Sequence, residues 1–389
     1  MSIYLDNSAT TKICREALDK YVELSSECFG NPSSLHAMGH LAEKELDAAR
    51  RILIDSLGAK GSEVVFCASG SEANNLAILG RAEAKERYKR GSRIITTDSE
   101  HASVSAPLDK LSSLGYEIVK IPTRGGTLDL NALENALTKN TILVTFMMVN
   151  NETGAVYDMQ AASNLIHALA PEAIFHVDAT QSYLKIPFTK RSIGADLITV
   201  SSHKIEGPKG VGALIIDPLV IKTRGIAPQI LGGGQEKGYR SGTENVPGVA
   251  AFGKAIEVNY SALSKNREKL ISLKEHLIKR LESDETLKAV SITKPTVSAP
   301  HIINITLPGI KSETMLHFLS SKGIFVSSGS ACSSNSQHVS SALVAFGRTP
   351  DEADHSLRVS LSPRNEISDI DALCEALCEG LSKLARVKR

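Results

Sequence analysis

Short apolar runs alternate with amphipathic stretches along the first two thirds of the chain. The runs are rich in β-branched residues and predict strands at EVVFC (63–67), RIITTD (93–98), YEIVKIP (116–122), TILVTFMMV (141–149), AIFHVD (173–178), DLITVS (196–201) and VGALIID (211–217). The stretches between them predict helices at 40–58, 72–91, 106–115, 131–138 and 160–170. Strands that are apolar throughout are typical of a sheet covered on both faces. The alternation predicts an α/β fold with a mostly parallel sheet flanked by helices.

The pattern changes after about residue 260, where a long helix at 266–283 is followed by a mixture of short strands and helices. A chain of 389 residues is long for one simple domain. We expect a large ligand-binding domain over residues 16–259 and a smaller α+β domain over residues 260–389. The first fifteen residues are too few to fold alone, and we expect segment 1–15 to pack on the small domain.

Composition and charge narrow the function further. Lys and Arg total 44 and Asp and Glu total 43, and a net charge of +1 gives no reason to expect nucleic acid or a membrane surface as a partner. The longest apolar run, near 141–149, is far short of the ~20 residues of a membrane span. The N-terminus has no secretory pattern. Six cysteines without a CxxC pair favour a reducing, cytoplasmic location.

Polar side chains that could hold a ligand follow five of the predicted strands. In an open α/β sheet, ligands bind beyond the carboxyl ends of the strands. In chain order, these residues are Gly70 and Ser71, then His101, then Asn151, then Asp178 and Gln181, and then Ser201, His203 and Lys204. Their convergence on one edge of the sheet predicts a single ligand site.

The set of groups suits pyridoxal 5′-phosphate. Gly70 and Ser71 open a predicted helix and would offer backbone N–H groups and a hydroxyl to a phosphate. Lys204 could form a Schiff base with the aldehyde, and Asp178 could keep the pyridine nitrogen protonated, which makes the ring an electron sink. His101 could stack on the ring and move protons. Gln181 could donate to the ring hydroxyl.

Each residue taken singly has a simpler explanation. Lys204 could be an ordinary surface lysine, and Asp178 could cap the helix that DATQS can start. His101 could be a hydrogen-bonded polar residue without a catalytic role, and SGSE is a common helix-capping sequence. The ordered set favours a cofactor site, because unrelated residues would not all fall at strand ends.

A series of motifs now identifies a family. They stand in the order YLDNSATT, FGNPSSLH, SEH, VNNETG, HVDATQS, SSHKIEGPKG, RSGTENV, SSGSACSS and LRVSL. By these motifs the chain resembles, over nearly its whole length, the cysteine desulfurases of the NifS/IscS type, within the class V aminotransferases of pyridoxal-phosphate fold type I. The SSGSACSS segment is similar to that of the members with a longer, mobile catalytic loop. The chain departs from the family pattern at Ser71, where threonine is common, and at Glu206, where an aromatic residue is common.

The resemblance implies a role for each matching residue. Lys204 would hold pyridoxal phosphate covalently, and Arg358, in LRVSL, would clamp the substrate carboxylate in a bidentate manner. Thr243, in RSGTEN, would contact the phosphate from the partner subunit, which implies a homodimer. The remaining matches are phosphate contacts at Gly70, Ser71, Ser201 and His203, and ring and substrate contacts at His101, Asp178, Gln181 and Asn151.

Cys332 lies in a loop of serine and glycine that we expect over residues 327–340. The resemblance implies that its thiolate attacks the sulfur of L-cysteine, so that alanine leaves and a persulfide remains on Cys332. A free thiol has a pKa near ~8.5, so the reaction needs an activated thiolate. An acceptor, either an iron–sulfur scaffold or a sulfur-carrier protein, would then take the sulfur. The alternative for Cys332 is an inert thiol in a turn.

Three other functions compete with desulfuration. A selenocysteine lyase would use the same cofactor and carboxylate clamp but depend less on Cys332. An ordinary class V aminotransferase would need a keto acid. A catalytically silent sulfur carrier or scaffold subunit would bind a partner without the cofactor, and the intact set of Lys204, Asp178 and Cys332 argues against it.

Overall fold

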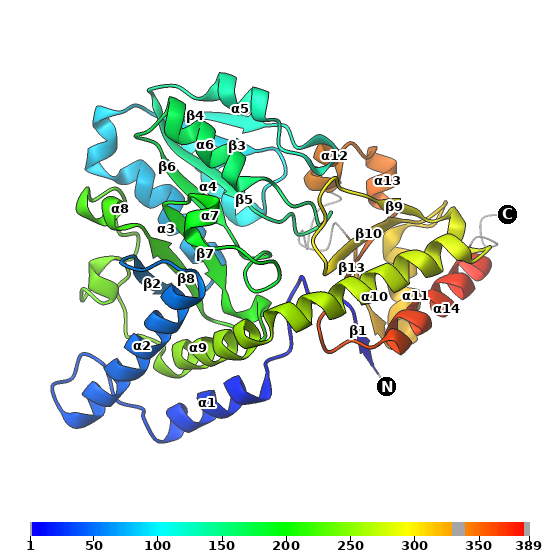
Figure 1. Cartoon of the computed structure of the whole chain (residues 1–389), viewed down its shortest axis with the longest axis horizontal. Helices are drawn as coiled ribbons and strands as arrows, with labels where there is room; N and C mark the ends of the chain where they lie inside the picture. Colours follow the sequence, from blue (N-terminus) through cyan, green and yellow to red (C-terminus); the bar gives the residue numbers. More distant parts are fainter. Residues whose placement is uncertain (1, 329–338, 385–389) are drawn as a thin grey trace.

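The computed structural model describes residues 2–328 and 339–384. Its larger part is built on a seven-stranded sheet of order β2-β8-β7-β6-β5-β3-β4 (Figure 1). The strands are β2 (Glu63–Cys67), β3 (Arg93–Thr97), β4 (Glu117–Ile121), β5 (Thr141–Met147), β6 (Ile174–Asp178), β7 (Leu197–Ser201) and β8 (Gly212–Ile216). All neighbours pair in parallel except β8, which is antiparallel to both β2 and β7. The predicted α/β fold with a mostly parallel sheet is confirmed.

Strand β8 runs against its neighbours because a short turn connects it to β7. Residues 202–211 hold one short 3-10 helix, Ser202–Lys204, and the GPKG turn. A parallel neighbour would need a crossover of a dozen or more residues. The other six strands share one direction, so their carboxyl ends meet at one edge of the sheet.

Helices cover both faces of this sheet. Along β2, Val64 and Phe66 belong to the core on one face, and Val65 and Cys67 belong to the core on the other, as the period of two of a strand requires. The first core is completed by helices α2 (Ala37–Ser56), α5 (Leu130–Ala136), α6 (Met159–Leu169) and α9 (Val246–Ser261). The second is completed by helices α3 (Gly70–Glu83), α4 (Ala102–Ser113) and α8 (Pro218–Lys222).

A smaller antiparallel sheet of order β12-β13-β10-β9 lies to the right in Figure 1. Its strands are β9 (Ser291–Thr293), β10 (Ile302–Thr306), β12 (Ser327–Ser328) and β13 (Ser356–Ser360). A separate apolar core packs it against helices α10 (Leu263–Ser283), α11 (Ser312–Ser321) and α14 (Ile367–Leu384). The remaining elements are α1 (Arg15–Ser26), α7 (Lys190–Ile193), α12 (Ser341–Phe346) and α13 (Pro350–Asp354).

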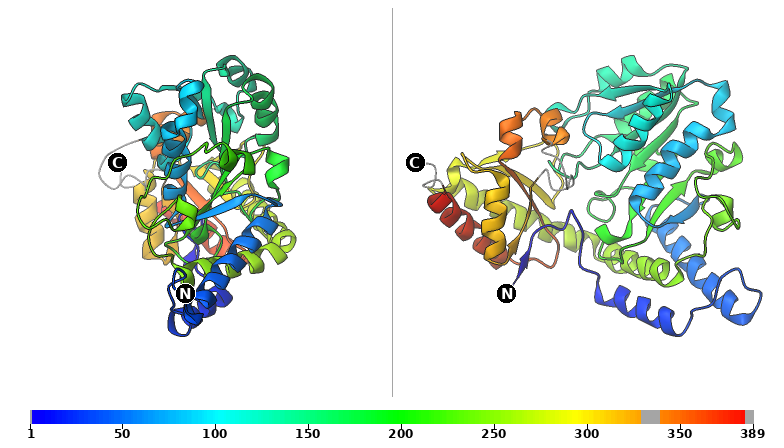
Figure 2. Two further views of the ribbon diagram at one scale, coloured as in Figure 1. Left: turned by 90° about the vertical axis from the view of Figure 1, so that its left-hand side faces the viewer. Right: turned by 180° about the vertical axis from the view of Figure 1, so that it is seen from behind.

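Two segments connect the two sheets. Helices α9 and α10 follow each other with one residue, Ala262, between them, and Figure 2 shows them passing from one sheet to the other. At the other end of the chain, β1 (Ile3–Tyr4) pairs in parallel with β11 (Ile324–Phe325), and Leu5 belongs to the smaller core. The chain then continues toward the large sheet, where the backbone N–H of Thr11 donates to the carbonyl of His203.

The long helices each bury one side. In α10, Leu270, Leu273, Leu277 and Leu281 recur every three or four residues and are buried, while most other positions are polar. This is the pattern of a helix that lies on a protein core with its other side in water. Among the residues that the structure describes, no helix combines the length and apolarity needed to cross a bilayer.

The predicted strands agree with the observed ones within two residues at each end. The helix predicted at 72–91 ends earlier, at Glu83, and a 3-10 segment at Lys85–Lys89 follows it. The helix predicted at 106–115 begins earlier, at Ala102, because Pro107 is accommodated in the second turn of α4. The sequence did not predict helix α9. Apolar residues lie on almost all sides of this helix, so its sequence has little amphipathic periodicity.

Candidate functional site

A cavity of about 280 Å³ lies at the carboxyl ends of the parallel strands. It contains every residue predicted for the site except Thr243 and Cys332. Its lining consists of Ser8, Ala9, Ser69, Gly70, Ser71, His101, Ser103, Met147, Val149, Asn151, Asp178, Thr180, Gln181, Ser201, His203, Lys204 and Arg358. Residues from both sheets and from the N-terminal segment therefore meet at one place.

The two other predicted residues are placed differently. Thr243 is exposed and lines another cavity, together with Glu236 and Arg240, on this same chain. Its contact with a phosphate in the partner subunit stays a prediction. Cys332 lies outside the described residues.

Asp178 ends strand β6 with its side chain buried against the cavity. Its Oδ1 accepts from the backbone N–H of Thr180 at 2.9 Å, and its Oδ2 accepts from Nδ2 of Asn74 at 2.9 Å. Both partners are neutral, so the carboxylate charge is not cancelled by them. Asp178 can therefore pair with a protonated group inside the cavity.

His101 forms the N-cap of α4, just beyond strand β3. Its Nδ1 lies 3.1 Å from the backbone nitrogen of Ser103 and 2.9 Å from the Ser103 hydroxyl. Burial lowers the pKa of His101, the charge of Asp178 raises it, and the charges of Lys204 and Arg358 lower it. His101 is thus a neutral imidazole at pH 7 that can exchange a proton with a bound group.

Gly70 begins helix α3 at one end of the cavity. The first N–H groups of a helix have no partner within the helix and favour an anion. A Cβ added at Gly70 would lie 3.2 Å from Cβ of Ser201 and 3.3 Å from Oγ1 of Thr180, so glycine allows these three backbone segments to meet. The Ser201 hydroxyl is buried and has no hydrogen-bond partner among the described residues. This end of the cavity offers donors that an anion could satisfy.

His203 lies beside this end, in the turn after strand β7. Its Nδ1 is 3.1 Å from the Thr10 hydroxyl. Burial, followed by the charges of Lys204 and Lys209, lowers the pKa of His203 to about 4. The side chain is therefore a neutral hydrogen-bonding group at pH 7.

Lys204 follows in the same turn, and its ammonium group points to the N-terminal segment. Nζ donates to the carbonyl oxygen of Ser8 at 2.5 Å and to that of Ala9 at 2.8 Å. Nε2 of Gln181 donates to the same Ser8 carbonyl at 2.9 Å. The N-terminal segment therefore positions two of the predicted site residues.

Arg358 enters the cavity from strand β13 of the smaller sheet. Its Nη2 donates to Oδ1 of Asp6 at 2.8 Å, and its Nη1 donates to the carbonyl of Asn151 at 3.0 Å. Its Nε is buried without a hydrogen-bond partner among the described residues. The guanidinium is held in place while its Nε–H stays available, which suits the binding of a carboxylate.

Glu206, one of the two departures from the family pattern, has a structural role here. Its φ is +61°, and its carboxylate accepts from Nε and Nη2 of Arg364 at 3.0 and 2.8 Å. Its backbone N–H donates to the Thr11 hydroxyl at 2.7 Å. The residue ties the turn after Lys204 to the N-terminal segment and to the turn between β13 and α14.

Several contributors to the site had no role assigned from the sequence, and four of them illustrate why. Ser8 and Ala9 lie in the YLDNSATT motif, which was a signal without a function attached. Asn74 and Ser103 bond to Asp178 and His101, and they lie inside helices where polar residues are unremarkable. Their contribution depends on contacts with residues far away in the sequence.

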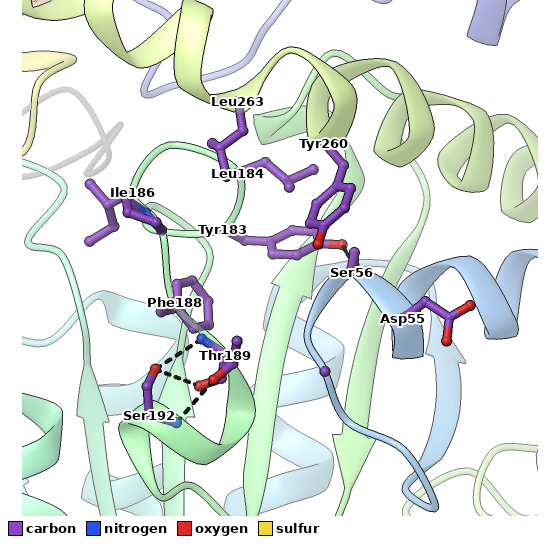
Figure 3. A pocket seen from close by; sticks show the side chains of 12 residues that line it. Asp55, Ser56, Tyr183, Leu184, Ile186, Phe188, Thr189, Ser192, Tyr260 and Leu263 are labelled. Atoms are coloured by element: carbon purple, nitrogen blue, oxygen red, sulfur yellow. Dashed lines mark hydrogen bonds between the residues drawn. The ribbon is translucent and has the colours of Figure 1, made fainter.

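A second cavity, of about 400 Å³, has no lining residue in common with the first. Figure 3 shows it between the end of α2, the loop that leads into α7, and the junction of α9 and α10. Tyr183, Leu184, Phe188 and Tyr260 form much of its wall. Of the predicted site residues that the structure describes, none lines it, so the chemistry belongs to the first cavity.

Comparison with known proteins places this site in a family. A model of the family described as "Aminotransferase class-V" matches residues 3–373. The chain belongs to the class-V aminotransferases.

Relatives of this class-V protein are of the NifS/IscS type. The "NifS/IcsS protein homolog" of Lactobacillus delbrueckii subsp. bulgaricus is 38% identical over 385 residues, which cover 97% of this chain and 96% of the relative. "Cysteine desulfurase IscS" of Methanosarcina thermophila is 36% identical over 385 residues, or 98% and 93% of the two chains. A solved structure named "NIFS-LIKE PROTEIN" superposes with a TM-score of 0.90 at 32% identity, covering 98% of this chain and all of the other.

Class-V membership implies pyridoxal 5′-phosphate, and the residues present fit that cofactor. The unpartnered Ser201 hydroxyl and the N-terminus of α3 suit its phosphate. Asp178, whose hydrogen-bond donors among the described residues are neutral, suits a protonated ring nitrogen. Lys204 lies on the same cavity as both and suits the aldehyde. The donor set is thus complementary to the three polar ends of the cofactor.

Proposed function

We propose that this class-V protein is a cysteine desulfurase that takes sulfur from L-cysteine and holds it as a persulfide on Cys332. The observation that carries the proposal is one cavity that contains Lys204, Asp178, His101 and Arg358 together. The relatives named cysteine desulfurase match this chain over nearly its full length, which supports the same conclusion.

The chain's own residues would bind and orient the substrate. Arg358 would hold the carboxylate of L-cysteine, and Asn151 lies next to it, since its carbonyl accepts from Nη1 of Arg358. Lys204 would hold the aldehyde carbon of pyridoxal 5′-phosphate and take the Cα proton of the substrate. When bound, that cofactor supplies an electron sink for the negative charge left at Cα. Asp178 would keep the proton on the ring nitrogen, and Gln181 would donate to the ring hydroxyl.

Cys332 would then complete the reaction. Its thiolate attacks the sulfur of L-cysteine, a sulfur–sulfur bond forms, and the bond between that sulfur and Cβ breaks. The electron pair of the broken bond stays with Cβ, which takes up a proton. Cα would take back a proton from Lys204, and alanine leaves. Cys332 retains the sulfur for an acceptor protein, either an iron–sulfur scaffold or a sulfur carrier.

Both described ends of the Cys332 segment are anchored beside the cavity, which supports this role. Ser328 is the last residue of β12, and its neighbour Ser327 pairs with Arg358 across the strands. At the other end, the Ser340 hydroxyl donates to Glu152 at 2.5 Å, and Glu152 follows Asn151. The described residues on either side of the segment that contains residue 332 therefore both lie beside the site.

The test is the release of alanine from L-cysteine with a reductant as the only addition. We expect the wild type to release alanine and Cys332→Ala to release almost none. Cys378→Ala is the matched control, because Cys378 is a partly exposed thiol on α14, and it should keep wild-type activity. Equal alanine from all three proteins would remove Cys332 from the reaction and favour a lyase that does not use a protein thiol.

A further inference from the structure

A chain of hydrogen bonds connects His101 to Asp178 behind the cavity. Nδ2 of Asn74 donates to Oδ2 of Asp178 at 2.9 Å and to the Ser103 hydroxyl oxygen at 2.9 Å. The Ser103 hydroxyl is in turn 2.9 Å from Nδ1 of His101. Asn74 and Ser103 come from helices α3 and α4, so two helices and the end of strand β6 meet in this chain.

The contacts decide which nitrogen of His101 carries the proton. The backbone nitrogen of Ser103 is an obligate donor, and it lies 3.1 Å from Nδ1. Nδ1 must therefore be the acceptor, and in a neutral ring Nε2 carries the hydrogen. The Ser103 oxygen already accepts from Asn74, so its own hydrogen is free to donate to Nδ1 as well. Ser103 thus stabilises the neutral ring through two donors.

The orientation of the Asn74 amide follows from Asp178. A carboxylate is an acceptor only, so the NH₂ group of Asn74 must face it. If the amide were flipped, Oδ1 of Asn74 would face Oδ2 of Asp178. It would also face the oxygen of the Ser103 hydroxyl, whose hydrogen is directed to Nδ1 of His101. Asn74 is 1% exposed, and its Oδ1 is buried without a partner among the described residues. The residue leaves its oxygen unsatisfied and places its NH₂ group between the two acceptors.

We propose that Asn74 and Ser103 are positioning residues whose side chains stabilise the neutral, Nε2-protonated ring of His101 and link it to Asp178. The inference rests on the proposed function, because it concerns the same site. It assigns to His101 an Nε2–H that is available for proton exchange, while Nδ1 is kept unprotonated. The charged groups that act on His101 are Asp178, which favours its protonation, and Lys204 and Arg358, which oppose it.

The experiment compares Ser103→Ala and Asn74→Ala with the wild type, all loaded with pyridoxal 5′-phosphate. Ser163→Ala is the matched control, since the Ser163 hydroxyl also lies against a histidine Nδ1, that of His167 at 3.0 Å on helix α6. Nitrogen-15 NMR of labelled histidines reports the tautomer directly. The signals of His101 are identified by their loss in His101→Gln.

In the wild type we expect an unprotonated Nδ1 and a protonated Nε2 at His101. In Ser103→Ala and Asn74→Ala the backbone N–H of residue 103 still donates to Nδ1, so the neutral ring should keep its tautomer. The neutral ring loses the support of the Ser103 hydroxyl, so the nitrogen-15 titration of His101 and the acid limb of the pH profile of kcat should both move to higher pH. We expect kcat to fall by about tenfold, the factor of one lost hydrogen bond, with KM changed less than threefold. Ser103→Thr keeps the hydroxyl and should restore the wild-type behaviour, and Ser163→Ala should leave His101 unaffected.

An unchanged nitrogen-15 titration of His101 and an unchanged pH profile in Ser103→Ala would overturn the proposal, whether or not Asn74→Ala folds. The NMR signal does not depend on turnover of L-cysteine. A wild type that shows the expected tautomer but releases no alanine would therefore overturn the proposed function and leave the positioning role intact.

Discussion

Arg358 shows at the scale of a single residue how the site prepares for its substrate. The guanidinium is buried beside the cavity. Its Nη2 and Nη1 donate to Asp6 and Asn151, and its Nε has no hydrogen-bond partner in the part of the chain that the structure describes. Burying an unpaired charged donor is costly, and a ligand carboxylate would remove that cost. The contact with Asp6 also fixes the plane of the guanidinium before the substrate arrives.

We expect Arg358→Lys to raise KM for L-cysteine at least tenfold and to change kcat little. Lysine keeps the charge but lacks the planar fork that pairs with a carboxylate, and the lost bond is worth about 1.5–3 kcal/mol. Steady-state alanine release measures both constants. The control is Lys322→Arg, which exchanges arginine and lysine in the opposite direction. Lys322 lies directly after α11 and does not line the cavity. An unchanged KM in Arg358→Lys would take Arg358 out of the substrate site.

At the scale of the elements, strand β6 brings a titratable group into the centre of the sheet. His176 is fully buried, with Nδ1 2.8 Å from the Thr145 hydroxyl of β5 and Nε2 2.9 Å from the Thr199 hydroxyl of β7. Burial lowers the pKa of His176 to about 4, and Asp178 opposes that effect. The neutral ring bridges the two neighbours of the strand that ends in Asp178.

This lowered pKa predicts a loss of stability in acid. In the unfolded chain His176 takes up a proton near pH ~6.5, whereas in the folded protein it does so near 4. Its contribution is therefore complete above pH ~6.5 and is lost as the pH falls toward 4, by about 2 kcal/mol between pH 7.5 and 5. We expect the urea midpoint of His176→Gln to fall less than that of the wild type over this range. The exposed His317→Gln should behave like the wild type, and equal falls in all three would contradict the prediction.

At the scale of the whole molecule, several large apolar side chains are exposed on the surface of this chain. Phe29 is 73% exposed, Leu35 is fully exposed and Leu231 is 79% exposed, and Thr243 is exposed on the same chain. Water-exposed apolar groups of this size favour association. A homodimer in which Thr243 completes the phosphate site of the other chain would account for both features.

Mixed dimers test this arrangement. We expect the protein to have a mass near 83 kDa, twice 41.6 kDa, by light scattering, and Thr243→Val to bind pyridoxal 5′-phosphate 10- to 150-fold more weakly, as for a lost hydrogen bond of about 1.5–3 kcal/mol to a charged group. A mixed dimer of Thr243→Val with Lys204→Ala would contain one complete site, with Lys204 from one chain and Thr243 from the other. It should bind one cofactor with wild-type affinity. If no site of the mixed dimer bound the cofactor with wild-type affinity, Thr243 would act within its own chain.

Much of this molecule could be inferred from the sequence alone. The alternation of β-branched runs and amphipathic stretches predicted the strands and the fold class, because this signal is carried by residues that are close together in the sequence. The positions of Gly70, His101, Asp178 and Lys204 after strands predicted a shared edge, since parallel strands end together. Asn151, Gln181, Ser201 and His203 were expected on the same grounds, and the structure places them on the same cavity.

Only the tertiary structure decided what surrounds these residues. The carbonyls of Ser8 and Ala9 reach Lys204 across almost 200 residues of sequence, and Asp6 meets Arg358 across 352. The Asn74 amide faces Asp178 because helix α3 packs beside the end of strand β6, which no local pattern indicates. Periodicity and turn chemistry act over a few residues, whereas hydrogen bonds between distant segments depend on how the packed elements bring them together. The sequence by itself therefore determined the elements and their chemistry, and packing determined the partners, the orientation and the proton positions.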